Sequence, residues 1–347
     1  MTGVSSRGWP GSGGPRGERV VLVVSIDTEC DKGPAWRTQF PLSFRSVTEA
    51  LPEVLMPLFR RHGVVPTFLL SPEVIQNDES VRVVAGLPDC ELGTHLHGEF
   101  VEPETNPAAL VTDTPQIAYN VDIEERKLAN LTEMFRARFR RQPRSFRGGL
   151  FALSANTLRI LESLGYEVDS SVTPFRTHRY ACGLECNYWG ASLHPYHPSR
   201  HDARRSGQLR ICEVPVTLFN PRFARWPAVL LRRLNDRISR RISKIRSSKA
   251  EVRTFWVRPF RGSADQLAEW SDAVIASWRG PGPPLINVMF HSVEAQPAAS
   301  PYAQTEADVG VLVDSLATLF AHLRRRYAVE SVGLGDAASV FFGETDR

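Results

Sequence analysis

Acidic, histidine and arginine side chains directly follow several short apolar runs of this sequence. The polar groups at the ends of these runs are Asp27-Thr28-Glu29, His95-Leu96-His97-Gly98-Glu99, Arg147-Gly148-Gly149, Asp169-Ser170-Ser171 and His291-Ser292. In parallel α/β folds the active site lies at the carboxyl ends of the strands. If the apolar runs are neighbouring parallel strands, these five groups meet at one mouth, and the sequence predicts an active site there.

Two histidines and two acids in this set have the spacing of a metal site. His95 and His97 are two residues apart, so on a strand or its extended end they project from the same side. Asp27 and Glu29 have the same spacing. Two histidines and one carboxylate can hold zinc or a similar divalent ion while one coordination position stays open. Such an ion lowers the pKa of a water molecule towards about 7 and polarises a carbonyl group.

His291 and Arg147 suggest the proton transfer and the charge balance of such a site. His291 ends a run typical of a buried strand and fits a general acid, the alternative being a hydrogen-bonded structural histidine. Arg147 stands between apolar and glycine neighbours, so it needs a carboxylate partner. Either Asp27 or Asp169 is in a position to supply it. A structural ion pair of this kind is compatible with orienting a catalytic base.

Two further patterns carry less chemistry. His194 and His197, with His201 nearby, lie in a loop broken by prolines, where loop packing or a substrate contact is favoured over a metal site. The glycine-rich stretches at 11–14 and 148–149 match no phosphate-binding loop, so the sequence predicts no nucleotide site.

Strands alternating with helices are predicted to position these residues. Eight apolar runs are predicted strands: 20–26, 65–70, 90–94, 145–147, 167–170, 211–216, 286–290 and 330–333. Amphipathic stretches between them are predicted helices: 47–61, 123–140, 156–164, 263–278 and 306–327. This alternation predicts an α/β fold with a mainly parallel sheet, either open or closed as a barrel.

The composition is that of an ordinary globular protein. Of the 347 residues, 42% are hydrophobic and 23% are charged, which excludes a disordered chain, a fibrous repeat and a coiled coil. The apolar run 20–26 is far shorter than the about 18 residues that a transmembrane helix needs. Residues 1–18 lack the apolar stretch of a secretory signal, and we expect a disordered leader before a single catalytic domain, 19–345. Five cysteines, an odd number, indicate reduced thiols in a cytoplasmic protein.

The net charge of +4 is unevenly distributed. The segment 222–249 holds ten Lys/Arg and one acid, a net +9, so the rest of the chain stands at −5, which argues against a nucleic-acid-binding body. Within it Leu230, Leu234, Ile238 and Ile242 form one helical stripe, so a basic helical insertion is predicted. This helix either packs on the domain by its stripe, lies in a membrane interface through 226–246, or binds an anionic partner.

Five segments in order resemble the polysaccharide deacetylases, the carbohydrate esterase family 4 or NodB-homology group, and most closely the branch whose first motif is S-I-D-T-E. The matching segments are Ser25–Glu29, Glu91–His97, Phe146–Gly149, Val168–Val172 and Met289–Ser292. The resemblance covers about residues 20 to 345. It implies a distorted (β/α)7 barrel, a divalent metal, expected to be zinc, and hydrolysis of N-acetyl groups on sugars. By this likeness Asp27 matches the catalytic base, His95 a metal ligand, Arg147 the residue that orients the base, and His291 the general acid.

The chain departs from the family pattern at two positions that concern the metal. The common first motif has two adjacent acids, whereas Thr28 follows Asp27 here. Either Glu29 replaces the missing ligand or Asp27 itself binds the metal. The common second motif has its second histidine four positions after the first, where this chain has Glu99. Either His97 or Glu99 therefore supplies that ligand.

The sequence thus predicts a metal-dependent hydrolase that removes acetyl from an N-acetylated sugar or glycan precursor. The predicted catalytic residues are Asp27, Arg147, Asp169 and His291, and the predicted metal ligands are Glu29, His95 and His97. One alternative is a hydrolase of the same fold acting on a non-sugar C–N bond, with or without metal. Another is a glycan-binding protein without activity, which the intact Asp27, His95 and His291 disfavour. A glycosidase is weaker, because no carboxylate pair flanking a cleft is evident.

Overall fold

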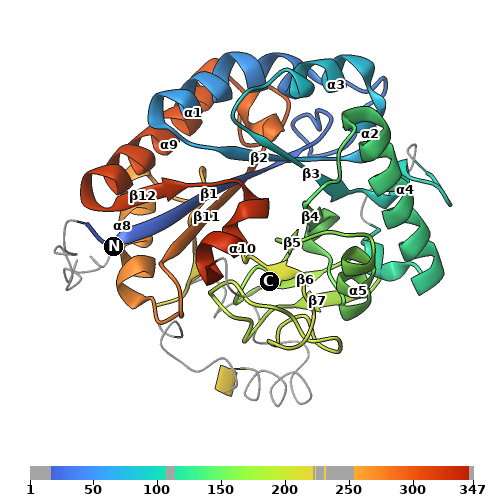
Figure 1. Cartoon of the computed structure of the whole chain (residues 1–347). Coiled ribbons are helices and arrows are strands. Elements are labelled where there is room, and N and C mark those ends of the chain that lie inside the picture. Colours follow the sequence, from blue (N-terminus) through green and yellow to red (C-terminus); the bar gives the residue numbers. More distant parts are fainter. Residues whose placement is uncertain (1–16, 107–113, 222, 224–229, 232–253, 344–347) are drawn as a thin grey trace, which may run out of the picture.

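Seven parallel strands curl into an incomplete barrel in the computed structural model, which describes residues 17–106, 114–221, 223, 230–231 and 254–343 (Figure 1). Their spatial order is β11 (Leu285–His291), β1 (Arg19–Thr28), β2 (Pro66–Leu70), β3 (Glu91–Leu96), β4 (Ser145–Gly148), β5 (Val168–Asp169) and β8 (Cys212–Glu213). An eighth strand, β12 (Ala328–Ser331), pairs with the start of β1. The predicted α/β fold with a distorted (β/α)7 barrel is confirmed, and all eight predicted strands are present.

The central strand β1 explains why the polar groups meet. It is buried from Val20 onwards and pairs in parallel with β11 on one side and with β12 and then β2 on the other. The register places Asp27 beside His291, and in the neighbouring pair β3–β4 it places His95 beside Arg147. Because all these strands run in the same direction, the residues at their carboxyl ends gather at one end of the barrel.

The interior of the barrel is layered from apolar to polar. At the amino ends of the strands an apolar cluster fills it, made of Val21, Val23, Leu69, Val168, Cys212, Val214 and Leu285, with Leu334 and Ala337 of α10 (Leu334–Phe342). The next layer holds the buried polar residues Ser25, Asn287, Arg147 and Ser170. Helix α10 thus closes one end of the barrel, and the chemistry is confined to the other end.

Helices cover the outside of the barrel (Figure 1). They are a π-helical segment (Ser46–Leu55), α1 (Met56–His62), α2 (Pro72–Gln76), α3 (Asp78–Ala85), α4 (Val121–Phe139), α5 (Ala155–Ser163), α8 (Ala264–Ser277) and α9 (Glu306–Arg326). Short 3-10 turns follow several strands: Gly98–Phe100, Gln116–Ala118, Gly149–Phe151 and Ser292–Ala295. All five predicted helices are present, the first as the π-helical segment plus α1. Ser154, Ser263 and Thr305 cap α5, α8 and α9 with reciprocal side-chain hydrogen bonds.

The gap between β8 and β11 is bridged by hydrogen bonds rather than by a strand ladder. The Thr217 N–H donates to the Asn287 carbonyl at 3.1 Å, and the Asn287 N–H donates to Thr217 Oγ1 at 2.8 Å. The Asn287 side-chain amide also donates to the carbonyls of Val214 and Pro215. Beside this seam lie two short antiparallel pairs, β6 (Thr177–Arg179) with β7 (Glu185–Asn187), and β9 (Leu218–Phe219) with β10 (Phe255–Trp256).

Several predictions concern regions away from the strand ends. His194 packs edge-on against Trp278 at 4.3 Å and His197 stacks on Phe342 at 4.9 Å, so this loop packs as favoured. All five cysteines are free thiols. No helix in the described ranges is both long and apolar enough to cross a bilayer. Most of the predicted leader 1–18 and of the basic insertion 222–249, with its membrane segment 226–246, lies outside the described residues.

Glu124→Gln is expected to remove a pH dependence of stability. Glu124 of α4 is buried and accepts a hydrogen bond from Thr157 of α5, and burial raises its pKa to about 7. The folded protein therefore keeps a proton that the unfolded chain loses, and stability falls as pH rises from about 4.5 to about 7. At about 1.4 kcal/mol per pKa unit, the stability of the wild type relative to Glu124→Gln should fall by roughly 3 kcal/mol across this window. Urea unfolding at pH 4.5 and pH 8 measures it, and a constant difference would contradict it.

Candidate active site

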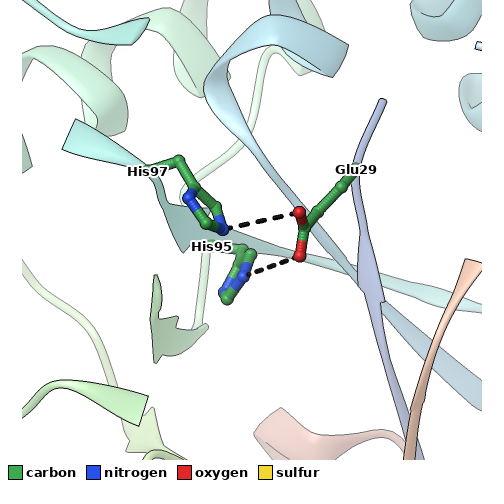
Figure 2. A group of neighbouring side chains, drawn as sticks. All are labelled: Glu29, His95 and His97. Carbon is green, nitrogen blue, oxygen red and sulfur yellow. Dashed lines mark ion pairs between the residues drawn. The ribbon is translucent and has the colours of Figure 1, made fainter. Parts of the chain in front are cut away.

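Glu29, His95 and His97 bring three ligand atoms together at the carboxyl ends of β1 and β3 (Figure 2). Nε2 of His95 lies 3.4 Å from Oε1 of Glu29, and Nε2 of His97 lies 3.5 Å from Oε2 of the same carboxylate. All three side chains are buried, and their ligand atoms lie within 4.8 Å of one another. Two imidazole nitrogens and one carboxylate suit zinc or a similar ion and leave a position open.

Hydrogen bonds to the far side of each histidine orient the rings for this role. Nδ1 of His95 lies 3.0 Å from the carbonyl oxygen of Arg147, which can only accept, so Nδ1 carries the proton. Nδ1 of His97 donates to Oε1 of Glu99 at 3.2 Å. Both rings therefore turn Nε2 towards Glu29, in the arrangement that outer partners impose on metal-binding histidines. Of these two residues, His97 belongs to the group that could hold a metal ion, and Glu99 lies behind it.

Charged neighbours hold these groups in defined protonation states. Burial alone would raise the pKa of Glu99, but the adjacent His97 lowers it. Burial alone would lower the pKa of His97, but Glu29 and Glu99 raise it well above its usual value. Burial would also raise the pKa of Glu29, yet Lys32 and His97 hold it well below its usual range. Without an ion in the site, these shifts favour ionised carboxylates and a protonated His97, and a bound cation would displace that proton.

Lys32 is a cation that the sequence reading did not include. Its Nζ lies 3.0 Å from Oε2 of Glu29, and both side chains are about 4% exposed. The Thr28 hydroxyl turns back to the carbonyl of Ile26 at 3.1 Å, so it does not reach the ligand group. The sequence left either Asp27 or Glu29 as the acidic metal ligand. Glu29 is the one that lies in the group that could hold an ion.

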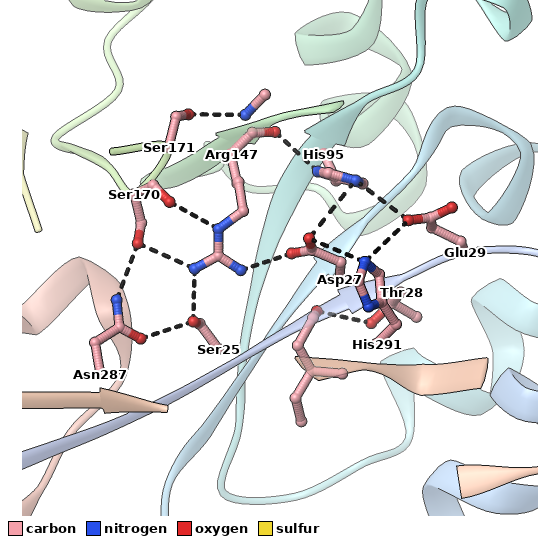
Figure 3. Close-up of polar contacts among 12 residues, drawn as sticks. Ser25, Asp27, Thr28, Glu29, His95, Arg147, Ser170, Ser171, Asn287 and His291 are labelled. Carbon is pink, nitrogen blue, oxygen red and sulfur yellow. Dashed lines mark hydrogen bonds and ion pairs between the residues drawn. The ribbon is translucent and has the colours of Figure 1, made fainter. Parts of the chain in front are cut away.

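Asp27 is held by Arg147 (Figure 3). Arg147 Nη1 donates to Oδ1 of Asp27 at 2.6 Å, and the guanidinium also donates to Ser25 Oγ at 2.6 Å and to the Ser170 carbonyl at 2.7 Å. Burial would raise the pKa of Asp27, but Arg147, His95 and His291 together lower it. The second oxygen, Oδ2, lies 3.8 Å from Nε2 of both histidines. Asp27 is thus an ionised carboxylate with one oxygen facing the centre of the site.

Arg147→Met is expected to destabilise the fold by about 3–5 kcal/mol, because it leaves the Asp27 charge buried and unpaired. The guanidinium is fully buried, so solvent does not screen the pair. Adding Asp27→Asn to this variant should recover part of the loss. Urea unfolding of the two single variants and the double variant measures the coupling, and strictly additive losses would contradict the ion pair as its cause.

His291 faces the same centre from β11. Its Nε2 lies 3.8 Å from Oδ2 of Asp27 and 3.9 Å from Oε1 of Glu29. On the far side Nδ1 donates to Oε1 of Glu294 at 2.9 Å, and the same oxygen accepts from Arg258. The pKa of Glu294 is lowered despite its burial, because Arg258 and His291 outweigh the desolvation. Glu294 thus fixes the orientation of the His291 ring.

Asp169 is the one predicted catalytic residue that the structure does not bring to this group. Val168 and Ser170 point into the barrel, so Asp169 between them faces the other side of the strand. There Oδ1 accepts from the Ser171 hydroxyl at 2.7 Å, and Ser171 Oγ accepts from the Gly148 N–H at 2.9 Å. The Arg147 carboxylate partner is accordingly Asp27. Asp169 supports the backbone that follows Arg147.

Asp169 also forms a buried acid pair with Glu213 of β8. Burial, followed by the charge of Asp169, raises the pKa of Glu213 well above its usual range. The raised pKa favours a protonated Glu213, which would relieve the repulsion between these two acids on the neighbouring strands β5 and β8.

Several residues that support the site were not foreseen. Three of them come from loops without a motif: Lys32, Arg258 and Trp36. The Trp36 ring packs edge-on against His291 at 4.9 Å. Two others left a signal in the sequence. Asn287 is a polar residue inside an apolar strand, and Glu294 follows His291 by three residues, the spacing of one short turn.

The comparisons bear on the fold. No family model and no curated protein matches the sequence. The structure is similar to a proposed polysaccharide deacetylase from Mycobacterium smegmatis, with 14% identity, a TM-score of 0.53, and 95% of this chain and 93% of that chain covered. It is also similar to a proposed glycoside hydrolase or deacetylase from Parabacteroides distasonis, with 14% identity, a TM-score of 0.53, and 94% of this chain and 71% of that chain covered. A third similar structure is PuuE allantoinase, with 11% identity, a TM-score of 0.54, and 98% of this chain and 96% of that chain covered. At these identities the likeness shows a shared fold, that of structures that include polysaccharide deacetylases.

Proposed function

We propose that this protein is a metal-dependent hydrolase that removes the acetyl group from an N-acetylated sugar or glycan precursor. One observation carries the proposal: the ligand group Glu29–His95–His97 has an ionised acid, Asp27, and an oriented histidine, His291, on its open side. Base, acid and ligand group are what amide hydrolysis requires. The family resemblance of five ordered motifs supports the sugar N-acetyl group as substrate.

The residues present fit a divalent ion. In both His95 and His97, Nδ1 makes a hydrogen bond on the outer side of the ring. Nε2 of each ring is therefore left to face Glu29 and could bind an ion. A divalent ion held by Glu29, His95 and His97, zinc in our proposal, would polarise the amide carbonyl and acidify a water molecule.

The chain's own residues supply the proton transfers. Oδ2 of Asp27 accepts the proton of the attacking water, while Arg147 holds Oδ1 and keeps the carboxylate ionised. Nε2 of His291, on the same side of the centre, donates a proton to the departing amine. Glu294 holds that ring in place through the hydrogen bond to Nδ1. Asp169, through Ser171 and Gly148, keeps the Arg147 backbone in place.

Acetate release from a panel of N-acetylated sugars, with and without chelator, tests the proposal. We expect release from at least one sugar, loss of it after chelation, and recovery when zinc is returned. Release that survives full removal of metal would contradict metal dependence. Its absence on every sugar, with metal bound, would contradict the deacetylase assignment.

A second candidate is hydrolysis of a C–N bond outside sugars. The fold likeness to an allantoinase favours it over a binding protein without activity. Adding ureido and cyclic amide compounds to the same panel separates the two candidates. The cytoplasm is the proposed location, which the five free thiols support.

A further inference from the structure

Lys127 of α4 carries a fully buried ammonium group that the proposed mechanism does not use. Its Nζ donates to the carbonyl oxygens of Gly98 at 2.7 Å and of Val101 at 2.6 Å, and it also donates to the carbonyl of Pro103. An ammonium group has three N–H donors, and burying it is costly unless these donors find acceptors. The three carbonyl oxygens supply those acceptors, so the loop that bears them is bound to Lys127.

This loop, residues 98–104, begins directly after His97. The carbonyl oxygen of Glu104 also lies 3.4 Å from the Lys127 ammonium. Carbonyl oxygens that point at one centre repel one another, so a cation between them favours the shape that the loop has here. Because α4 packs against β3, its lysine reaches the point where the chain leaves that strand. Lys127 therefore fixes the course of the chain after β3.

The first residue of the loop has little room to move. The carbonyl of Gly98 accepts from Lys127, and a Cβ atom at Gly98 would lie 2.8 Å from the ring of Tyr119. The Lys127 ammonium itself lies 4.7 Å from the centre of the Tyr119 ring, a favourable cation–π distance. Gly98 thus contacts both the ammonium and the ring, and it is the residue that joins His97 to Glu99.

Glu99 is the residue of this loop that contacts the ligand group. Its Oε1 accepts from Nδ1 of His97 at 3.2 Å, and its backbone carbonyl accepts from the Asn106 N–H at 3.0 Å. Lys127 holds the chain on both sides of Glu99, at Gly98 and at Val101. The position of the carboxylate behind His97 therefore depends on Lys127.

Other side chains hold the loop less firmly. Asn130 of α4 donates to the Glu102 carbonyl at 2.8 Å, and Gln76 of α2 donates to the Phe100 carbonyl at 3.1 Å. Each of these amides is neutral and holds one carbonyl, whereas hydrogen bonds from a charged donor are roughly twice as strong as neutral ones. Lys127 is therefore the main support of the loop.

We propose that Lys127 is a positioning residue of the metal site, which acts through Glu99 to keep His97 turned towards Glu29. The inference rests on the proposed function for the metal, and it adds a residue that reaches neither the ion nor the substrate. Outer partners of metal-binding histidines fix the ring orientation, and losing one typically lowers metal affinity by about 10–100-fold. Lys127 would carry that effect one step further from the ion.

The zinc affinity of Lys127→Met, measured by competition with a chromogenic chelator, tests the inference. We expect binding that is weaker by about 10–100-fold, as for loss of an outer partner, with an unchanged circular dichroism spectrum. Arg126→Met is the matched control, because it removes a positive charge from the exposed neighbour on the same helix, and it should keep the wild-type affinity. Lys127→Gln retains an amide donor for the loop and carries the test if Lys127→Met does not fold. A smaller loss is expected for it.

A double-variant cycle shows whether Lys127 acts through Glu99. Added to Glu99→Gln, the change Lys127→Met should weaken zinc binding little further, because both changes release the same support of His97. A general loosening of the fold would instead multiply the two losses. Zinc affinities of the wild type, the two single variants and the double variant measure this, and losses that multiply would overturn the inference.

Hydrogen exchange of chelator-treated protein gives a readout that needs neither ion nor turnover. The amides of 98–106 should exchange faster in Lys127→Met than in the wild type and in Arg126→Met. Weaker zinc binding in Lys127→Met, in a protein that deacetylates no sugar, would support the inference and contradict only the proposed function. Unchanged zinc affinity in Lys127→Met and Lys127→Gln, in a protein that does deacetylate, would overturn the inference and leave the proposed function intact. A wild type that binds no zinc would overturn both.

Discussion

His95→Ala and His97→Ala are each expected to lose bound metal and acetate-releasing activity together while the fold survives. Each change removes one of the two imidazole ligands and leaves only two of the three ligand atoms that Glu29, His95 and His97 bring together. The backbone of β3 keeps its ladder to β2 and β4 in both variants. Elemental analysis, circular dichroism and acetate release on the same preparations measure the three properties.

Glu99→Gln separates the two possible second ligands. Glu99 accepts from Nδ1 of His97, so this change should weaken metal affinity by about 10–100-fold without abolishing it. His201→Ala, an exposed histidine in a loop, is the control and should keep full metal and activity. Full metal occupancy in both His95→Ala and His97→Ala would overturn the ligand assignment. If only His97→Ala retained the metal, Glu99 would be the better second ligand.

His291→Ala is expected to keep the metal and to lower kcat by about 10²–10⁴-fold, the usual contribution of general acid–base catalysis. The His291 ring lies on the open side of the ligand group, 3.8 Å from Asp27, and belongs to a different strand from the ligands. Steady-state acetate release, with metal content measured alongside, tests this.

Chemical rescue distinguishes a proton donor from a structural ring. Added imidazole should restore part of the lost kcat in His291→Ala. The His291 side chain is about 13% exposed and packs against Trp36, so its removal leaves a space that imidazole can enter from solvent. A loss smaller than about fivefold, far below the usual range, would reduce His291 to a structural role.

The strands and the polar residues at their ends were predictable because the same feature of the sequence, an apolar run followed by a polar residue, indicates both. A strand buried on two faces, such as β1, reads as an uninterrupted apolar run, and the first polar residue after it marks the barrel mouth. The boundaries were accurate for the same reason: Asp27 and His291 end such runs, and the parallel register then places them side by side. The predicted helix 156–164 is followed by Gly165, which takes the left-handed φ of +86° that suits a residue just beyond a helix end.

Other parts of the site could not be read from the sequence because they depend on long-range packing. Lys32 and Trp36 lie in one loop, and nothing local indicates that one reaches Glu29 and the other reaches His291. The inward or outward direction of Asp169 depends on the pleat of a two-residue strand, which its motif does not define. The pairing of Glu213 with Asp169 likewise requires β8 to lie next to β5.

The ion pair between Lys32 and Glu29 has a consequence for how the protein is assembled. Many small metalloproteins fold only when the ion arrives, because the free energy of binding the ion is what stabilises their folded state. Here the ammonium group already neutralises the buried carboxylate, and the barrel core lies at the opposite end. For the proposed ion we therefore expect folding and loading to be separate events: the chain would reach its native shape first and would take up or release the ion afterwards, in a reversible exchange with the surrounding supply.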